Sequence, residues 1–302
     1  MTYEVFHGLP AHRLTLDNGD TVCVAQQGAQ VLSWVSAGRE RLYLSTGNLF
    51  DGHTAIRGGV PVCFPQFNMR GSLPKHGFVR NLPWVLDAAA HDALHDKPQG
   101  AHSLCFVLQD SAATHVHWDT SFHAALTITL APAELRMDLT VKNTGTQDWS
   151  FTGALHTYLA VQDIQNVSLE GLGGQAEWDA LTDRHAQAQT VLRMEGEFDR
   201  VYRAALQPLR LAEPGLGLLI SQSESWANTV VWNPGPHKLL ADMPEGDHAR
   251  MLCVEAAQVF EPVLVPAGQV WQGWQLLQVS HEVQCITPSS VSKASLRSSP
   301  PA

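Results

Sequence analysis

The feature of this sequence that most constrains its fold is a period of two in the placement of apolar residues. Short runs of alternating apolar and polar side chains are separated by Gly, Pro, Asn and Asp, which is the pattern of strands and turns. The clearest runs are residues 14–16 and 21–24, which flank Asp17-Asn18-Gly19-Asp20. Because Asn-Gly supplies the positive φ angles of a tight turn, these runs are expected to form an antiparallel hairpin.

Further β-rich runs follow along most of the chain. Residues 124–130 and 135–141 are joined by Ala-Pro-Ala-Glu, which predicts a second hairpin. No long amphipathic helix is evident, so the many short strands favour two packed antiparallel sheets over a parallel α/β sheet. The predicted fold is all-β, a large antiparallel β-sandwich. Its other expected strands are residues 31–35, 150–161, 206–211, 218–221, 229–232, 251–259 and 274–279.

Composition agrees with that class and limits the kinds of partner. The 302 residues are 44% hydrophobic and 16% charged, which supplies a sizeable core and excludes a disordered chain. A formal net charge of −10 opposes long-range attraction to nucleic acid or to an anionic membrane, so neither partner is expected. Since no run of about 18 apolar residues exists and residues 1–10 lack a signal-peptide pattern, a cytoplasmic protein is expected.

The chain is expected to form one domain. No internal repeat and no linker-like stretch interrupts residues 1–285, which predicts a single β-sandwich domain. A monomer is expected, although no pattern in the sequence determines the oligomeric state. Residues 286–302 are rich in Ser and Pro and contain almost no large apolar side chain. They can bury little surface, so a flexible tail is expected there.

The cysteines and histidines predict no metal site. The cysteines are odd in number, far apart and without a CxxC pair, so buried free thiols are expected. His115-Val116-His117, with His123 nearby, could place two ligands on one strand face, but no carboxylate follows at a spacing that completes a cupin-like set. The cysteines are Cys23, Cys63, Cys105, Cys253 and Cys285.

A Gly- and Pro-rich segment between two arginines, Arg57 and Arg80, predicts an anion site. It begins with Arg57-Gly58-Gly59 and ends with Lys75-His76-Gly77-Phe78-Val79-Arg80. Successive N–H groups in a Gly-rich turn can form a nest for an anion, and arginine adds a fork suited to phosphate or carboxylate. The alternative is a surface network in which both arginines pair with acids.

Two titratable residues on later strands are candidates for catalysis. The strand period places His156 on one face with Thr152, Ala154 and Tyr158, although a histidine in a strand is more often structural. Glu255 is the only charge within an apolar run, and a buried carboxylate is costly unless it is paired or functional. A structural ion pair is the alternative for Glu255.

Three further residues are weaker candidates for a sugar site. Asp199 lies in a segment that feeds a strand, where its carboxylate could accept hydrogen bonds from sugar hydroxyls. Trp226 and Trp232 could form a wall of such a site, although tryptophan is more often part of a core.

Taken in order, these segments resemble the glucose-6-phosphate 1-epimerases, which are hexose-6-phosphate mutarotases of the aldose 1-epimerase superfamily. The resemblance extends from about residue 14 to residue 279. The segments that carry it are Arg57-Gly58-Gly59-Val60-Pro61-Val62-Cys63-Phe64-Pro65, His76-Gly77-Phe78-Val79-Arg80, Ala154-Leu155-His156-Thr157-Tyr158, Asp199-Arg200-Val201-Tyr202, Val231-Trp232-Asn233-Pro234 and Cys253-Val254-Glu255.

The resemblance implies a galactose mutarotase-like sandwich that needs no metal or organic cofactor. It also implies a small-molecule sugar phosphate as partner, with interconversion of the α and β anomers of a hexose 6-phosphate, glucose 6-phosphate first among them. His156 matches the family's catalytic histidine and Glu255 its catalytic glutamate. Glu255 would be the base and His156 the acid, and a neighbouring carboxylate and a bound phosphate are expected to favour the imidazolium form.

The resemblance also implies the residues that bind substrate. Arg57, Arg80 and Asp199 match substrate-binding positions, and His76 matches a position that lines the site. Lys75 stands where relatives often carry Gln, and a lysine there could strengthen phosphate binding. Which of the three cations contacts the phosphate stays open.

Three alternatives for the function stay open. The chain could be a mutarotase of unphosphorylated aldoses, in which case the cations have another role. It could be a non-catalytic carbohydrate-binding module, because fold does not settle function. It could also be a glycoside hydrolase that uses Glu255 with Asp199, since two carboxylates can perform that reaction.

Overall fold

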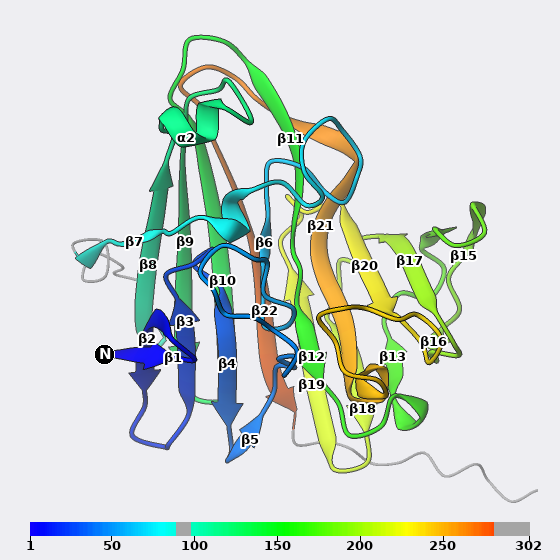
Figure 1. The fold of residues 1–302 in the computed structure, drawn as a ribbon. Helices are drawn as coiled ribbons and strands as arrows, with labels where there is room; N and C mark the ends of the chain where they lie inside the picture. The colour runs from blue at the N-terminus through cyan, green and yellow to red at the C-terminus, as the bar shows by residue number, and fades with distance from the viewer. Residues whose placement is uncertain (89–97, 281–302) are drawn as a thin grey trace, which may run out of the picture.

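The computed structural model describes residues 1–88 and 98–280, and these residues form three antiparallel sheets (Figure 1). The prediction of an all-β antiparallel fold is therefore confirmed. The described helices are single turns, and none of them is long and apolar enough to cross a membrane. They are η1 (Val79–Asn81), α2 (Ala112–His115), η2 (Ile164–Asn166) and η3 (Asp247–Arg250).

The N-terminal residues form a five-stranded sheet whose strands pair in chain order. The predicted hairpin joins β2 and β3, but of Asn18 and Gly19 only Gly19 has a positive φ, +88°. The loop therefore spans residues 16–20, and the N–H of Leu16 donates to the carbonyl of Asp20 at 2.9 Å. The strands are β1 (Thr2–Phe6), β2 (Leu9–Thr15), β3 (Thr21–Ala25), β4 (Val31–Ser36) and β5 (Arg39–Glu40).

A nine-stranded sheet forms the second layer, in the order β16-β13-β18-β19-β22-β10-β9-β8-β7. Burial alternates along its central strands β9 and β10, because one face packs on the core and the other faces solvent. The strands are β7 (Val85–Leu86), β8 (His102–Gln109), β9 (Phe122–Ala131), β10 (Glu134–Asn143), β13 (Ser168–Glu170), β16 (Val191–Leu192), β18 (Leu209–Glu213), β19 (Leu216–Gln222) and β22 (Val270–Ser280).

An eight-stranded sheet has the order β15-β14-β17-β20-β21-β11-β6, and β12 pairs with β21 beside β11. The first nine residues of β21 are buried, so this strand is covered on both faces there. The strands are β6 (Val62–Cys63), β11 (Trp149–Leu155), β12 (Tyr158–Ala160), β14 (Ala176–Asp179), β15 (Arg184–Gln187), β17 (Phe198–Arg203), β20 (Asn228–Asn233) and β21 (Met251–Val265).

One apolar core joins the three sheets. Trp34 of the five-stranded sheet, Phe106 of the nine-stranded sheet and Val254 of the eight-stranded sheet belong to the same buried cluster. In Figure 1 the five-stranded sheet lies over β8 to β10, and the eight-stranded sheet lies beside it. The predicted β-sandwich thus has one layer of nine strands and a second layer built from the other two sheets.

The predicted strand over residues 150–161 is broken, and the break positions His156. Strand β11 ends at Leu155 and β12 begins at Tyr158. The register with β21 already shifts between Phe151 and Gly153, and the N–H of His156 donates to the carbonyl of Pro61 at 3.0 Å. His156 therefore hydrogen-bonds across to the loop that begins with Arg57.

The expectations for the cysteines, for the histidines near residue 115 and for the C-terminal tail have different outcomes. The four described cysteines are free and buried, as predicted. His115 ends helix α2 and does not lie on a strand, and its Nε2 lies 3.0 Å from Asp110 Oδ2. Cys285 and the tail expected at residues 286–302 lie outside the described residues.

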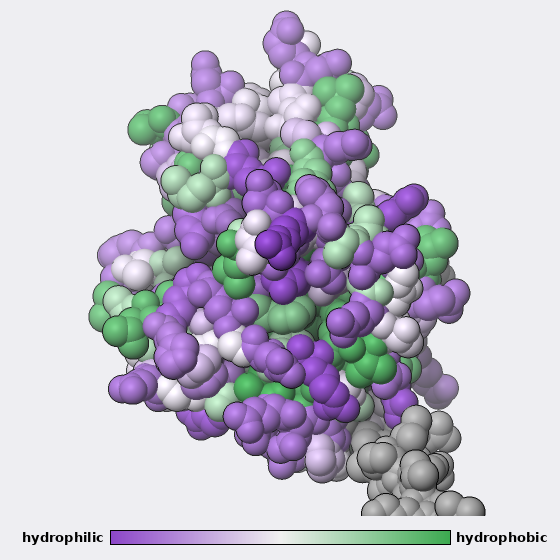
Figure 2. All heavy atoms as spheres, turned by 90° about the vertical axis from the view of Figure 1, so that its right-hand side faces the viewer, coloured by the Kyte–Doolittle hydropathy of each residue, from purple (hydrophilic) through white to green (hydrophobic). Residues whose placement is uncertain are grey.

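The side of the molecule at the right of Figure 1, where β15 and β16 lie, is mainly hydrophilic (Figure 2). Its hydrophobic side chains form small separate groups among the coloured residues. Large continuous apolar patches are typical of protein or membrane contacts. This face therefore gives no indication of such a contact.

Candidate active site

The candidate site lies on the face of the eight-stranded sheet that points away from the main core. On β21, Val254 and Ala256 belong to the core, so the period of two turns Cys253, Glu255 and Ala257 to the opposite face. A pocket of about 330 Å³ opens on this face. Glu255, which the sequence shows as a lone charge in an apolar run, is therefore at the base of a cavity.

All seven residues to which the family resemblance assigns a role line this one pocket. They come from the segment between the two arginines, from the break between β11 and β12, and from strands β17 and β21. Their side chains are therefore close enough to act on one small ligand, while their individual roles stay predictions. The residues are Arg57, Lys75, His76, Arg80, His156, Asp199 and Glu255.

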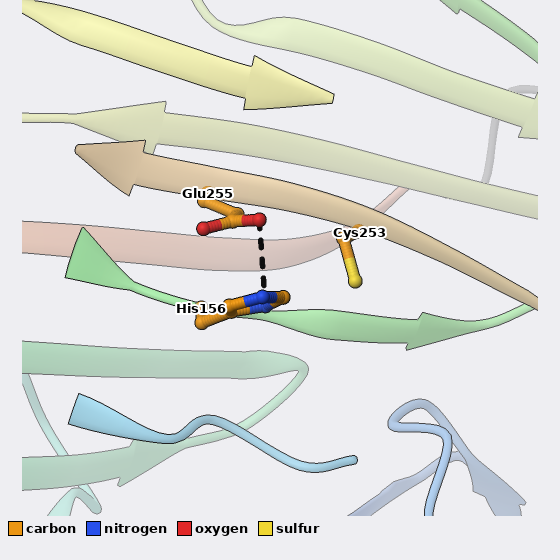
Figure 3. Close-up of side chains that lie close together, drawn as sticks. All are labelled: His156, Cys253 and Glu255. Carbon is orange, nitrogen blue, oxygen red and sulfur yellow. Dashed lines mark ion pairs between the residues drawn. The ribbon is translucent and has the colours of Figure 1, made fainter. Parts of the chain in front are cut away.

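His156 and Glu255 face each other at the base of the pocket (Figure 3). His156 Nδ1 lies 3.4 Å from Glu255 Oε1, and the side chains are only 9% and 2% exposed. Neither His156 Nδ1 nor Glu255 Oε2 has a hydrogen-bond partner in the structure. The ring of Tyr158 stacks on the imidazole with centroids 4.7 Å apart and planes at 6°, which fixes the orientation of the ring.

The protonation of this pair is set by its burial. Burial, and then the guanidinium groups of Arg80 and Arg57, lower the pKa of His156 well below its ordinary value. Burial, and then the carboxylate of Asp199, raise the pKa of Glu255 well above its ordinary value. The protein's own groups thus favour a neutral imidazole, and the imidazolium expected with a bound phosphate stays a prediction.

His76 presents a neutral imidazole to the same pocket. Burial, and then electrostatic repulsion between the protonated forms of His76 and His156, lower its pKa far below the ordinary value. Its Nδ1 accepts a hydrogen bond from the backbone N–H of Asn68 at 3.3 Å, so the ring proton lies on Nε2. The ring meets that of His156 edge to face with centroids 5.3 Å apart. His76 can therefore donate a hydrogen bond to a ligand.

The cations of the pocket differ in how far their charge is compensated. Arg57 Nε donates to Asp242 Oδ1 at 2.7 Å, and Arg57 Nη1 donates to the Tyr158 hydroxyl at 3.3 Å. Arg80 Nη2 donates only to the backbone carbonyl of Lys75, at 2.9 Å, and Arg80 Nε is buried without a partner. In the described parts of the chain neither Arg80 nor Lys75 pairs with a carboxylate. The alternative, in which both arginines pair with acids, thus holds for Arg57 but not for Arg80 among the described residues.

The weaker candidates have separate outcomes. Asp199 lies on β17 and lines the pocket, where burial raises the pKa of its carboxyl. Trp232 lines the pocket beside Tyr158, with ring centroids 6.2 Å apart. Trp226 is fully buried in the main core and packs against Trp271, so it is no part of the site.

Among the described residues, one group has the ligand types and spacing of a metal site, and it is not the histidine group that was weighed and set aside from the sequence. It comprises His156, Cys253 and Glu255. His115, His117 and His123 form no such group in the described chain.

The sequence pattern that characterises the aldose 1-epimerase family matches residues 12–278 of this chain. The chain belongs to this family. It is 34% identical over 255 residues to a Cenchrus ciliaris protein that carries the provisional name glucose-6-phosphate 1-epimerase, with 82% of this chain and 77% of the relative covered. An Escherichia coli K12 protein with the same provisional name is 34% identical over 249 residues, with 78% and 79% covered. The protein is therefore an epimerase, an isomerase acting on sugars.

Solved structures agree with this assignment. The crystal structure of YeaD from Salmonella typhimurium, provisionally described as a mutarotase, has a TM-score of 0.82 at 28% identity and covers 92% of each chain. A galactose mutarotase-like protein from Clostridium acetobutylicum has a TM-score of 0.71 at 12% identity, covers 92% of this chain and 98% of its own, and shows the shared fold. The predicted galactose mutarotase-like sandwich is confirmed.

Other residues of the epimerase pocket were missed by sequence reasoning. Arg70 stacks over Trp178 at 5.4 Å, and both line the pocket. Lys238 and Asp242 come from the connection between β20 and β21 and also line it. These positions carry no local pattern. Tyr158 also lines the pocket, and for this residue the sequence gave an indication, because the strand period places it on the same face as His156.

We expect Gly77→Ala to destabilise the epimerase by more than about 3 kcal/mol. Gly77 has φ +71°, and a Cβ there would lie 1.9 Å from the carbonyl oxygen of Phe64. Gly19→Ala is the matched control, because Gly19 has φ +88° with nothing within 4 Å of the added Cβ, so it should cost about 1 kcal/mol. Urea denaturation of both variants measures the difference, and equal losses would contradict the close packing of the loop beneath His76.

The neutral state of His76 predicts a pH dependence of stability. Because folding lowers the pKa of His76, the unfolded chain binds a proton that the folded chain does not below about pH 6.5, so stability falls with falling pH. His76→Gln removes this contribution and should flatten the slope between pH 6.5 and 5 by up to about 1.4 kcal/mol per pH unit. Denaturation midpoints across this range measure both slopes, and parallel slopes would rule out a buried neutral His76.

Proposed function

We propose that this epimerase interconverts the α and β anomers of a hexose 6-phosphate, with glucose 6-phosphate as the first substrate. The observation that carries the proposal is a buried acid–base pair, His156 and Glu255 at 3.4 Å, in one pocket with two cations, Arg80 and Lys75, that have no carboxylate partner among the described residues. The pair suits ring opening and the cations suit a phosphate. The provisional names of the two relatives support this substrate class.

The reaction needs one proton removed and one delivered. Glu255 takes the proton of the C1 hydroxyl while His156 donates a proton to the ring oxygen, so the bond between C1 and the ring oxygen breaks and an aldehyde forms. Rotation about the C1–C2 bond presents the other face of the aldehyde. His156 then takes back the proton of the hydroxyl that formed from the ring oxygen, Glu255 returns its proton to the carbonyl oxygen, and the ring closes as the other anomer. Each positioned group contributes about 10²–10⁴ in rate.

The burial of the pair is compatible with this exchange. Glutamic acid with neutral imidazole carries the same two protons as glutamate with imidazolium, so the competent state differs from the neutral one only in where one proton lies. A phosphate bound at Arg80 would offset the guanidinium that lowers the pKa of His156. Substrate binding would thereby favour the imidazolium that donates to the ring oxygen.

Recognition of the rest of the sugar follows from the remaining groups. His76 offers its Nε2–H as a donor, and Asp199 offers a carboxylate that can accept from hydroxyls. Trp232 supplies an apolar wall. The family assignment favours this epimerase over the binding-module and glycoside-hydrolase alternatives.

The test is anomer exchange followed by NMR on glucose 6-phosphate and on glucose with the same protein. Each charge-assisted hydrogen bond to a phosphate contributes about 1.5–3 kcal/mol. We therefore expect kcat/KM for glucose to be lower by at least about 10²-fold. Equal values for both sugars would favour a mutarotase of unphosphorylated aldoses, and no acceleration with either sugar would reject catalysis.

A further inference from the structure

The catalytic pair has a third neighbour that the proposed reaction does not use. Cys253 lies two residues before Glu255 on β21, so both side chains lie on the pocket face (Figure 3). The Cys253 Sγ, a ring nitrogen of His156 and a carboxylate oxygen of Glu255 all lie within 4.8 Å of one another. Three different types of metal-ligating atom thus lie close to one another.

Two of these side chains also carry polar atoms without partners. His156 Nδ1 and Glu255 Oε2 are buried and make no hydrogen bond with any residue that the structure describes, and the side chains are 9% and 2% exposed. Buried polar atoms in proteins are normally satisfied, so unpartnered ones indicate a group that binds there. A sugar hydroxyl can satisfy such atoms during the reaction, but it does not account for the thiol.

We propose that His156, Cys253 and Glu255 bind Zn²⁺ and that the bound cation inhibits the epimerase. The set of one nitrogen, one sulfur and one oxygen ligand is typical of Zn²⁺ and unlike that of Mg²⁺ or Ca²⁺. Binding stands on the geometry alone, whereas inhibition rests on the proposed function. The cation is an inhibitor here and not a cofactor of the reaction.

The distances suit a tetrahedral cation. Zn²⁺ binds these atoms at about 2.0–2.3 Å, which separates neighbouring ligand atoms by about 3.3–3.8 Å in a tetrahedron. The 3.4 Å between His156 Nδ1 and Glu255 Oε1 already has this value. With all three ligand atoms within 4.8 Å, a shift of about 1 Å closes the set. The fourth position then faces the pocket that His156 and Glu255 line.

The charges of the set also suit a buried cation. A thiolate and a carboxylate cancel the two charges of Zn²⁺, and the imidazole binds as a neutral ligand. The complex is therefore neutral as a whole, which limits the cost of burial and the repulsion from Arg57 and Arg80. Coordination engages the histidine nitrogen and the carboxylate together, so neither can exchange a proton with a sugar.

Binding is tested directly with Co²⁺ on the chelator-treated full chain, because a thiolate ligand gives a charge-transfer absorption band. We expect the band in the wild-type protein and in the control Cys105→Ser, and its loss in Cys253→Ser. Cys105 is a buried thiol on β8 in the other layer of the sandwich. In addition, Glu255→Gln should weaken Co²⁺ binding at least about tenfold, as expected when a ligand is removed.

Inhibition is tested by anomer exchange with and without Zn²⁺, each protein being compared with its own metal-free rate. Saturating Zn²⁺ should lower the rate of the wild type and of Cys105→Ser at least tenfold, and Cys253→Ser should need at least tenfold more Zn²⁺. If Cys253→Ser does not fold, the same measurements on Cys253→Ala, together with Co²⁺ binding to Glu255→Gln, test whether these side chains bind the cation.

The two proposals fail in different ways. No thiolate band in the wild type, or an unchanged band in the folded Cys253 variant, overturns the zinc site. A band that depends on Cys253, in a protein without anomer exchange on any hexose 6-phosphate, supports the zinc site and rejects the proposed function. Anomer exchange that Zn²⁺ does not slow overturns the inhibition.

Discussion

Replacing Glu255 with Gln is expected to slow anomer exchange by about 10²–10⁴-fold without loss of stability. The amide has nearly the shape of the carboxyl group but cannot take the proton of the C1 hydroxyl. Because burial and Asp199 already raise the pKa of Glu255, a neutral side chain suits this position, and the melting temperature should not fall. NMR exchange on glucose 6-phosphate and thermal unfolding of the same preparation measure both effects.

A matched buried glutamate separates catalysis from structure. Glu213 Oε1 pairs with Arg39 at 3.0 Å, Glu213 Oε2 accepts from the N–H of Gln162 at 2.8 Å, and its side chain is fully buried outside the pocket. Glu213→Gln should therefore cost about 1–3 kcal/mol of stability and leave the rate per folded molecule unchanged. If Glu255→Gln instead behaved like Glu213→Gln, Glu255 would be a structural ion-pair residue.

The sequence predicted the membership of the pocket better than its interactions. The period of two placed His156 and Tyr158 on one face, and the lone charge in the apolar run marked Glu255. Family resemblance joined these strands with the segment between Arg57 and Arg80. Each of these signals is either local in sequence or rests on an ordered set of motifs. Neither kind depends on knowing which distant segments come into contact in the fold.

What the sequence did not predict depends mainly on contacts between distant segments. Asp242 compensates Arg57, but it lies 185 positions away in a connection without a local pattern. At the break after Leu155 the N–H of Thr157 donates to the carbonyl of Leu155 at 3.0 Å, a local turn that a strand pattern does not show. The neutral state of His156 depends on its burial and on two guanidinium groups, so it also required the fold.

For Cys253 the sequence predicted the burial of the thiol but not its position beside His156. Its apolar neighbours predicted a buried free thiol, and the structure confirms that. The same alternation that turns Val254 into the core turns Cys253 toward the pocket face, where it meets His156. Burial alone did not reveal this, because strand β21 is covered on both faces at this point.

The pairing of Arg57 with Asp242 separates the roles of the two arginines. Arg80→Gln should lower kcat/KM for glucose 6-phosphate by about 10–10²-fold, since Arg80 has no carboxylate partner in the described chain and a charge-assisted bond contributes about 1.5–3 kcal/mol. Its kcat/KM for glucose should change less than about threefold, because an unphosphorylated sugar makes no such bond. Both values come from NMR exchange at subsaturating sugar.

Arg57→Gln provides the comparison. This change leaves Asp242 unpaired and removes the bond to the hydroxyl of Tyr158, whose ring orients His156. It should therefore lower kcat/KM for both sugars, whereas Arg80→Gln lowers it for the phosphorylated sugar alone. If Arg80→Gln left the preference for glucose 6-phosphate unchanged, Arg80 would not bind the phosphate. A loss confined to glucose 6-phosphate in Arg57→Gln would instead assign the phosphate to Arg57 despite its carboxylate partner.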